Sequence, residues 1–147
     1  MTLLRSATIG AVALIALTAT SEARPHHHRY HLDASGNTAS AHALAASPYK
    51  AAYVSAKHGV LGLVKTLALE GADAGITATA VCPAFVRTPL AEEQVEARGL
   101  DAVIERHAVK RLLEPAEVAD LVAFLLGPTG RGITGVALPI DLGWTAA

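Results

Sequence analysis

The chain has little cysteine and little net charge. Its single cysteine, Cys82, excludes an internal disulfide, and its place at the end of a predicted strand, beside Pro83, favours a buried thiol over a nucleophile. The net charge of −1 argues against a nucleic-acid-binding surface. Hydrophobic residues make up 52% of the chain and the mean hydropathy is +0.37, which indicates a compact soluble protein rather than a disordered tail.

The N-terminal region lacks an apolar run long enough to span a bilayer comfortably. The run from Ala7 to Ala19 is preceded by Arg5 and followed by Ser21-Glu22-Ala23, which together match the three regions of a secretory signal. We interpret residues 1–36 as a signal-like or aberrant leader with its junction, and residues 37–147 as a separate domain. We favour a gene-level origin for the leader and a cytoplasmic protein. Export is the alternative if the signal is genuine.

A histidine cluster, His26-His27-His28 with His31, raises the question of metal binding. No carboxylate or cysteine ligand is placed with it, and it lies in the predicted junction, so we predict no metal site. We also expect neither nucleic acid nor membrane among the partners.

Tyr53, Lys57 and Ser40 can assemble a proton-transfer site. If Ala51 to Leu69 is helical, Tyr53 and Lys57 are four residues apart and share one helix face. A free tyrosine has a pKa of about 10, and a positive charge nearby favours the phenolate, which can then act as a general base. A hydroxyl from Ser40, thirteen residues upstream of Tyr53, would hydrogen-bond the substrate oxygen. The alternative is a core tyrosine beside a surface lysine.

Hydrophobic patterning predicts an α/β fold with parallel strands. The predicted elements are a helix over Ala51 to Glu70, a strand over Ile76 to Cys82, a polar helical flap over Leu90 to His107, a helix over Pro115 to Leu126, and a strand over Ile133 to Ile140. The first helix has apolar residues on most faces, so we expect it to be buried against both the sheet and a second surface.

The motifs of the domain follow one another in an order that carries further information. They are Ala39-Ser40-Ala41-His42, Ala46-Ser47-Pro48-Tyr49-Lys50, Tyr53 to Lys57 with His58-Gly59-Val60, Cys82-Pro83 to Arg87-Thr88-Pro89-Leu90, Arg111 to Leu126, and Ile133-Thr134-Gly135 to Gly143-Trp144-Thr145-Ala146. On these motifs, residues 37–147 resemble the C-terminal part of the short-chain dehydrogenase/reductase family, most closely its D-3-hydroxybutyrate dehydrogenases. The resemblance implies part of a Rossmann-like doubly wound parallel sheet that lacks its N-terminal coenzyme-binding half.

The resemblance implies roles for the three residues of the proton-transfer site. Ser40, Tyr53 and Lys57 match the catalytic serine, tyrosine and lysine of the family, and Lys57 also reaches the nicotinamide ribose. The expected chemistry is NAD-dependent interconversion of 3-hydroxybutyrate and acetoacetate by a homo-oligomer, a tetramer in the family. Val86 and Thr88 are expected to contact the nicotinamide, together with Tyr53 and Lys57.

The small hydroxy acid substrate is expected to bind between a polar and an apolar wall. By the resemblance, His42 and Lys50 hold its carboxylate, and Phe85 and Trp144 surround its methyl end. These residue types suit a short anion, which needs charged or hydrogen-bonding partners at one end and an apolar boundary at the other. Taken singly, His42 is a solvated loop histidine, Lys50 a charge near a helix start, and Trp144 a core residue.

Several features of the family are missing. Residues 1–35 contain only Gly10 as glycine, so they lack the Gly-rich turn that receives the coenzyme pyrophosphate. The upstream asparagine of the catalytic set and a glutamine that contacts the carboxylate are absent as well. Pro83-Ala84 replaces a Pro-Gly, and Leu142 replaces a glycine before Gly143. Where such a position needs a positive φ, the side chain introduces strain. The alternative function is therefore an inactive fragment or oligomerisation module of a short-chain dehydrogenase.

Overall fold

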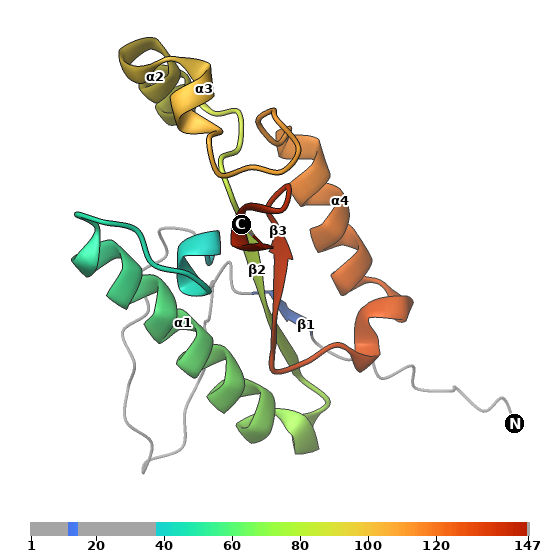
Figure 1. The fold of residues 1–147 in the computed structure, drawn as a ribbon. Coiled ribbons are helices and arrows are strands. Elements are labelled where there is room, and N and C mark those ends of the chain that lie inside the picture. Colours follow the sequence, from blue (N-terminus) through green and yellow to red (C-terminus); the bar gives the residue numbers. More distant parts are fainter. Residues whose placement is uncertain (1–11, 15–37, 147) are drawn as a thin grey trace, which may run out of the picture.

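The computed structural model describes residues 12–14 and 38–146, in which three parallel strands are flanked by helices (Figure 1). The strands lie in the order β1 (Val12–Leu14), β2 (Thr77–Pro83) and β3 (Val136–Ile140). The predicted α/β architecture with a parallel sheet is thereby confirmed. Both helix-flanked sides are visible in Figure 1, with α1 (Ala51–Glu70) on one side of the strands and α4 (Pro115–Leu126) on the other.

Strand β2 is the centre of the core. Six of its seven residues are buried, and Ala78 and Cys82 are completely inaccessible. Small and β-branched side chains such as these suit a strand that is covered on both faces. Helix α1 packs on it through Val64 and Ala68, which belong to the same buried cluster.

Helix α1 begins and ends where the sequence predicts, but its burial is one-sided. Of its twenty residues only Val64 and Ala68 are buried, and Leu69 keeps 81% of its surface exposed. The expected packing against the sheet is confirmed. The face that was expected to meet a second surface is open to solvent in the single chain.

The segment predicted as a polar helical flap, Leu90 to His107, contains two helices. Helix α2 (Pro89–Arg98) ends at Gly99, and α3 (Leu100–Val103) follows it. The helices are separate because Gly99 has φ = +81°, which a right-handed helix does not use. A small core beneath the pair contains three buried residues and two partly buried ones, namely Val103, Ile104 and Leu112 with Phe85 and Val95.

Helix α4 has the predicted bounds, whereas strands β2 and β3 differ from the predicted Ile76 to Cys82 and Ile133 to Ile140 only at their ends. Helix α4 begins with Pro115 after a capping box between Glu114 and Glu117, and it stops at Gly127 as predicted. Strand β3 begins at Val136 rather than Ile133, because Gly135 has φ = +69°. Short 3₁₀ helices complete the description: η1 (Ala41–Ala43), η2 (Ala72–Ala74), η3 (Pro128–Gly132) and η4 (Trp144–Ala146).

Part of the predicted leader contributes to the sheet. Val12–Leu14 pair with β2 in parallel, with Val12 opposite Thr77. A short extended segment can occupy this position because the edge of β2 offers free backbone donors and acceptors. The sequence predicted no secondary structure for these three residues. The histidines at 26–28 and 31 and the rest of the predicted leader lie outside the described residues.

Within residues 12–14 and 38–146, no helix combines the length and the apolar character that crossing a bilayer requires.

Cys82 is a buried thiol, as predicted. It has no accessible surface, and burial raises its pKa from 9.0 to about 11, against the opposing effect of a hydrogen bond with Ser40. Two pKa units mean about 100-fold less thiolate at pH 8 than in the unfolded chain. We expect a disulfide-type thiol reagent to modify Cys82 at least about 100-fold more slowly in the folded protein than in the protein in denaturant. Equal rates in folded and denatured protein would contradict this burial.

Candidate active site

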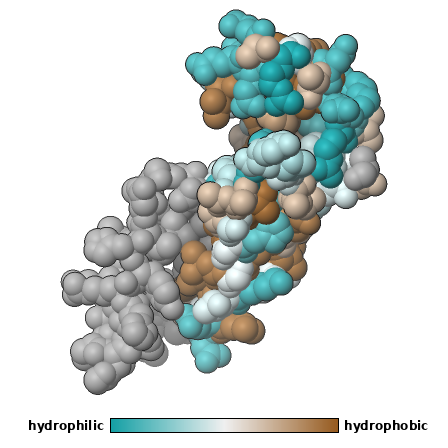
Figure 2. Space-filling model, turned by 60° about the vertical axis from the view of Figure 1, so that its left-hand side comes forward, coloured by the Kyte–Doolittle hydropathy of each residue, from teal (hydrophilic) through white to brown (hydrophobic). Residues whose placement is uncertain are grey.

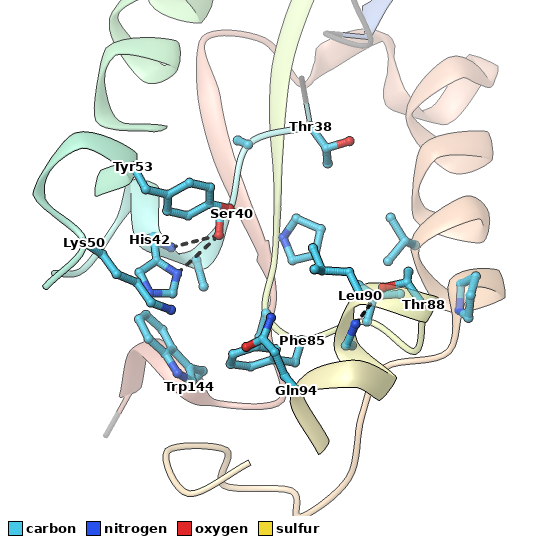
Figure 3. Close-up of a pocket in the computed structure, with 18 residues that line it drawn as sticks. Thr38, Ser40, His42, Lys50, Tyr53, Phe85, Thr88, Leu90, Gln94 and Trp144 are labelled. Atoms are coloured by element: carbon cyan, nitrogen blue, oxygen red, sulfur yellow. Dashed lines mark hydrogen bonds between the residues drawn. The ribbon is translucent and has the colours of Figure 1, made fainter. Parts of the chain in front are cut away.

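A cavity of about 890 Å³ opens at the carboxyl ends of β2 and β3 (Figure 3). Its walls are residues 38–42, the start of α1, the loop after β2, the first turns of α2 and α4, and Trp144. Ligands of parallel α/β sheets bind at this edge. Helices α2 and α3 form the lobe at the top of Figure 1, and Figure 2 shows mainly hydrophilic side chains on that lobe.

Eight of the nine predicted site residues line this one cavity. They are Ser40, His42, Lys50, Tyr53, Phe85, Val86, Thr88 and Trp144. Lys57 is the exception, because its ammonium lies behind Tyr53, 5.6 Å from the centre of that ring, and donates a hydrogen bond of 2.7 Å to the carbonyl of Thr38. The structure therefore brings the predicted set together, including the shared helix face of Tyr53 and Lys57.

Ser40 and Tyr53 present their hydroxyl groups to the cavity from different elements. Ser40 caps η1, and its Oγ accepts a hydrogen bond of 3.2 Å from the backbone N–H of His42. Tyr53 lies in the first turn of α1 and keeps 46% of its surface exposed. Figure 3 shows both side chains directed into the same space. This pair can hydrogen-bond one oxygen atom of a ligand and transfer a proton to or from it.

His42 is buried, not a solvated loop histidine. Its Nε2 lies 3.0 Å from Ser47 Oγ, and its Nδ1 lies 3.5 Å from Ser40 Oγ. Its ring packs edge-on against Tyr53, with 5.5 Å between ring centres, and at a tilt of 41° against Trp144, with 4.8 Å between ring centres. Burial lowers the pKa of His42, and the positive charges of Lys50 and Arg106 lower it further.

Phe85 and Val86 are held in the cavity wall by backbone pairing. The carbonyl of Phe85 accepts a hydrogen bond of 2.9 Å from Leu113 N–H, and Val86 forms a parallel bridge with Leu113. The ammonium of Lys50 lies 5.8 Å from the centre of the Phe85 ring. A cation and an aromatic wall therefore stand side by side at this end of the cavity.

Trp144 is positioned by a buried carboxylate that sequence reasoning missed. Asp141 accepts hydrogen bonds from Gly143 N–H and from both the backbone and the hydroxyl of Thr145, at 2.6 to 3.0 Å. Burial opposes ionisation of Asp141, but these hydrogen bonds outweigh it and lower its pKa. The signal in the sequence is an acidic residue followed by Gly143 and Thr145, which is typical of a tight turn.

Gln94 is a second residue that sequence reasoning missed. It lies on α2 four residues after Leu90, and both line the cavity. Figure 3 labels its side chain beside Phe85. The spacing of four that places both residues on one helix face was available in the sequence, but the segment was treated only as a polar flap.

One of the two suspected strained positions is strained. Leu142 has φ = +54°, whereas Ala84 does not have a positive φ. The carbonyl of Leu142 accepts hydrogen bonds from Ala108 and Val109 at 2.8 and 3.1 Å, which tie the C-terminal segment to the loop after α3. These bonds hold the leucine in a conformation that usually requires glycine.

Tyr49 is strained as well, with φ = +62°, and its side chain is fully exposed. It directly precedes Lys50, so this turn sets the direction in which Lys50 enters the cavity. Replacing Tyr49 with asparagine, which tolerates this conformation, is expected to stabilise the fold by about 0.5–1 kcal/mol in denaturant unfolding. Tyr49→Phe keeps the strain and serves as the control, and equal stability of the two variants would disprove the argument.

Comparison with known proteins identifies a family and several proteins that this chain resembles. The model of a family described as enoyl-(acyl carrier protein) reductase matches residues 7–145. The D-beta-hydroxybutyrate dehydrogenase of Rhizobium meliloti (strain 1021) is 42% identical over 121 residues, which cover 75% of this chain and 47% of that protein. A short chain dehydrogenase family protein from Francisella tularensis subsp. tularensis SCHU S4 superposes with a TM-score of 0.70 at 29% identity, over 75% of this chain and 50% of that one.

The chain belongs to the short-chain dehydrogenase/reductase family. It spans about half the length of the curated relatives it matches. Two solved members of the short-chain dehydrogenase/reductase family contain coenzymes. The first is 4-hydroxyisoleucine dehydrogenase complexed with NADH, with a TM-score of 0.70 and 34% identity over 74% of this chain and 45% of that one. The second is ElxO with NADP bound, with a TM-score of 0.69 and 32% identity over 74% of this chain and 45% of that one.

Proposed function

We propose that this chain carries the catalytic and substrate-binding residues of a nicotinamide-dependent short-chain dehydrogenase/reductase that interconverts 3-hydroxybutyrate and acetoacetate. The observation that carries the proposal is the single cavity that Ser40 and Tyr53 line together with His42, Lys50 and the aromatic side chains of Phe85 and Trp144. The likeness to a D-beta-hydroxybutyrate dehydrogenase supports the substrate.

The cavity offers both kinds of contact that the substrate needs. Lys50 and His42 offer a positive charge and a hydrogen-bonding ring to the carboxylate, and Gln94 adds an amide. Phe85 and Trp144 supply the apolar boundary that a methyl group needs. A short anion bound to these groups has its hydroxyl carbon near Ser40 and Tyr53, which line the same cavity.

The chain's own residues account for the proton transfer. In the oxidation of the alcohol, the O–H bond breaks and its proton passes to the phenolate oxygen of Tyr53, while the C3–O bond becomes a carbonyl. The ammonium of Lys57 lies 5.6 Å from the centre of the Tyr53 ring, on the same helix face. The hydroxyl of Ser40 donates to the substrate oxygen while its charge changes. In the reduction of acetoacetate, the same proton returns from Tyr53.

The residues around the cavity fit the nicotinamide end of a coenzyme. Val86 and Thr88 line the same cavity as Tyr53, and Lys57, behind the Tyr53 ring, would reach the ribose. A cavity of about 890 Å³ is far larger than a four-carbon acid alone requires, so it has room for a ring beside the substrate. When bound, an oxidised nicotinamide accepts the hydride that leaves C3. We propose NAD as the coenzyme.

The test is turnover by the purified 147-residue chain. D-3-Hydroxybutyrate is supplied with NAD or with NADP, and 2-butanol, which lacks the carboxylate, is the matched substrate. Formation of reduced coenzyme from the acid, with much slower formation from 2-butanol, is the expected result. A folded protein that oxidises neither alcohol would refute the proposal, and equal rates for both would refute the role of the carboxylate.

A second candidate function, an inactive oligomerisation module, is favoured by the open face of α1. Leu69 on α1 is 81% exposed. On α4, Phe124 is 45% exposed and Leu126 is 50% exposed. A second copy of the chain would cover such apolar side chains. Light scattering tests this candidate: an oligomer that persists in Leu69→Lys would argue against α1 as its interface.

A further inference from the structure

Arg106 joins three parts of the chain at the outside of the cavity. It lies in the turn after α3, and its guanidinium is centred 3.9 Å from the middle of the Trp144 ring. One of its nitrogens donates a hydrogen bond of 3.3 Å to the carbonyl of Ala46, sixty residues earlier in the chain. A planar cation stacked on an indole ring is a favourable contact, and Arg stacks better than Lys because its charge is spread over a plane.

The Trp144 ring also contacts His42, with 4.8 Å between ring centres, and His42 in turn contacts Tyr53. A continuous row of rings therefore runs from Arg106 to the tyrosine of the site. Trp144 is 3% exposed and His42 is 8% exposed, so this row is packed rather than mobile surface. Figure 3 shows Trp144 directly below His42 in the cavity wall.

We propose that Arg106 is a positioning residue, which holds Trp144 against His42 and so determines the shape and charge of the wall that receives the substrate carboxylate. The consequence for turnover rests on the proposed function, whereas the contact with Trp144 does not.

The charged and titratable groups around His42 are Lys50, Arg106 and Tyr53. Burial, Lys50 and Arg106 act in the same direction on the pKa of His42, which they lower, so the ring stays neutral at neutral pH. A neutral His42 keeps one nitrogen as donor and one as acceptor between Ser40 and Ser47. Loss of Arg106 would remove both a positive charge and the support of the Trp144 ring.

Trp144 is the only tryptophan of the chain, so its fluorescence reports on this contact without any activity measurement. A protonated imidazole quenches indole emission, and His42→Gln identifies the transition that belongs to His42. We expect Arg106→Gln to raise the pH midpoint of this transition by about half a unit. Arg106→Lys keeps the charge and should restore the midpoint. Arg131→Gln removes an exposed arginine outside the cavity and should change nothing.

In kinetics, Arg106→Gln should raise KM for 3-hydroxybutyrate about 10-fold with kcat within about threefold, since binding rather than proton transfer is affected. Arg106→Lys should recover KM only in part, because it lacks the planar stack. An unchanged midpoint in Arg106→Gln would overturn the proposal. If the wild type shows no turnover, the proposed function fails, and the fluorescence midpoint still decides the role of Arg106.

Discussion

Replacing Tyr53 with phenylalanine is expected to reduce turnover of 3-hydroxybutyrate by about 10²- to 10⁴-fold, the usual contribution of a general acid or base. The substitution removes one oxygen atom at the cavity wall. The ring that contacts His42 at 5.5 Å and shields Lys57 remains. Because Tyr53 is 46% exposed, we expect the free energy of unfolding to stay within about 0.5 kcal/mol of the wild type.

The chain contains a matched control for this experiment. Tyr49 lies four residues before Tyr53, is fully exposed and does not line the cavity. Tyr49→Phe makes the same chemical change outside the site and should leave turnover unchanged. If Tyr53→Phe turned over at the rate of Tyr49→Phe, Tyr53 would not be the proton-transfer residue.

Replacing Gly130 with alanine is expected to destabilise the fold by about 3 kcal/mol in denaturant unfolding, at the upper end of the cost of overpacking. A Cβ at this position would collide with the backbone of Leu125, where it would lie 2.6 Å from Cα and 2.7 Å from the carbonyl carbon, and would also meet the carbonyl oxygen. Leu125 is 1% exposed, so neither its backbone in α4 nor the backbone at Gly130 can move without disturbing the core.

Gly132 lies in the same short helix, η3, and provides the control. A Cβ there would meet no atom within 4 Å, so Gly132→Ala should change the free energy of unfolding by less than about 0.5 kcal/mol. Equal effects of the two substitutions would mean that the close approach of η3 to Leu125 is absent in solution.

Local sequence signals were sufficient for much of the fold. Helices α1 and α4 begin and end as predicted. The bounds of α4 were readable because Pro115, Gly127 and Pro128 restrict the backbone wherever they occur. The break at Gly99 and the late start of β3 were missed. Both depend on a positive φ at a glycine, which the sequence permits but does not require.

Within the site, the residues nearest in sequence were easiest to predict. The four-residue spacing of Tyr53 and Lys57 on a helix is a local property, and the structure agrees with it. Gln94, Asp141 and Arg106 were missed because each acts on residues that are distant in the chain or through a turn. Arg106 meets Ala46 and Trp144 only after the loop after α3 has packed against the C-terminal segment.

The amino-acid sequence by itself determined the family, the α/β class and the set of side chains available for proton transfer, because motifs and hydrophobic periods are properties of neighbouring residues. Only the tertiary structure decided that His42 is buried, that Leu142 is held at a positive φ, and that α1 keeps an open face. Burial and strain arise from contacts between segments far apart in the chain, and those contacts exist only after the helices and strands have packed.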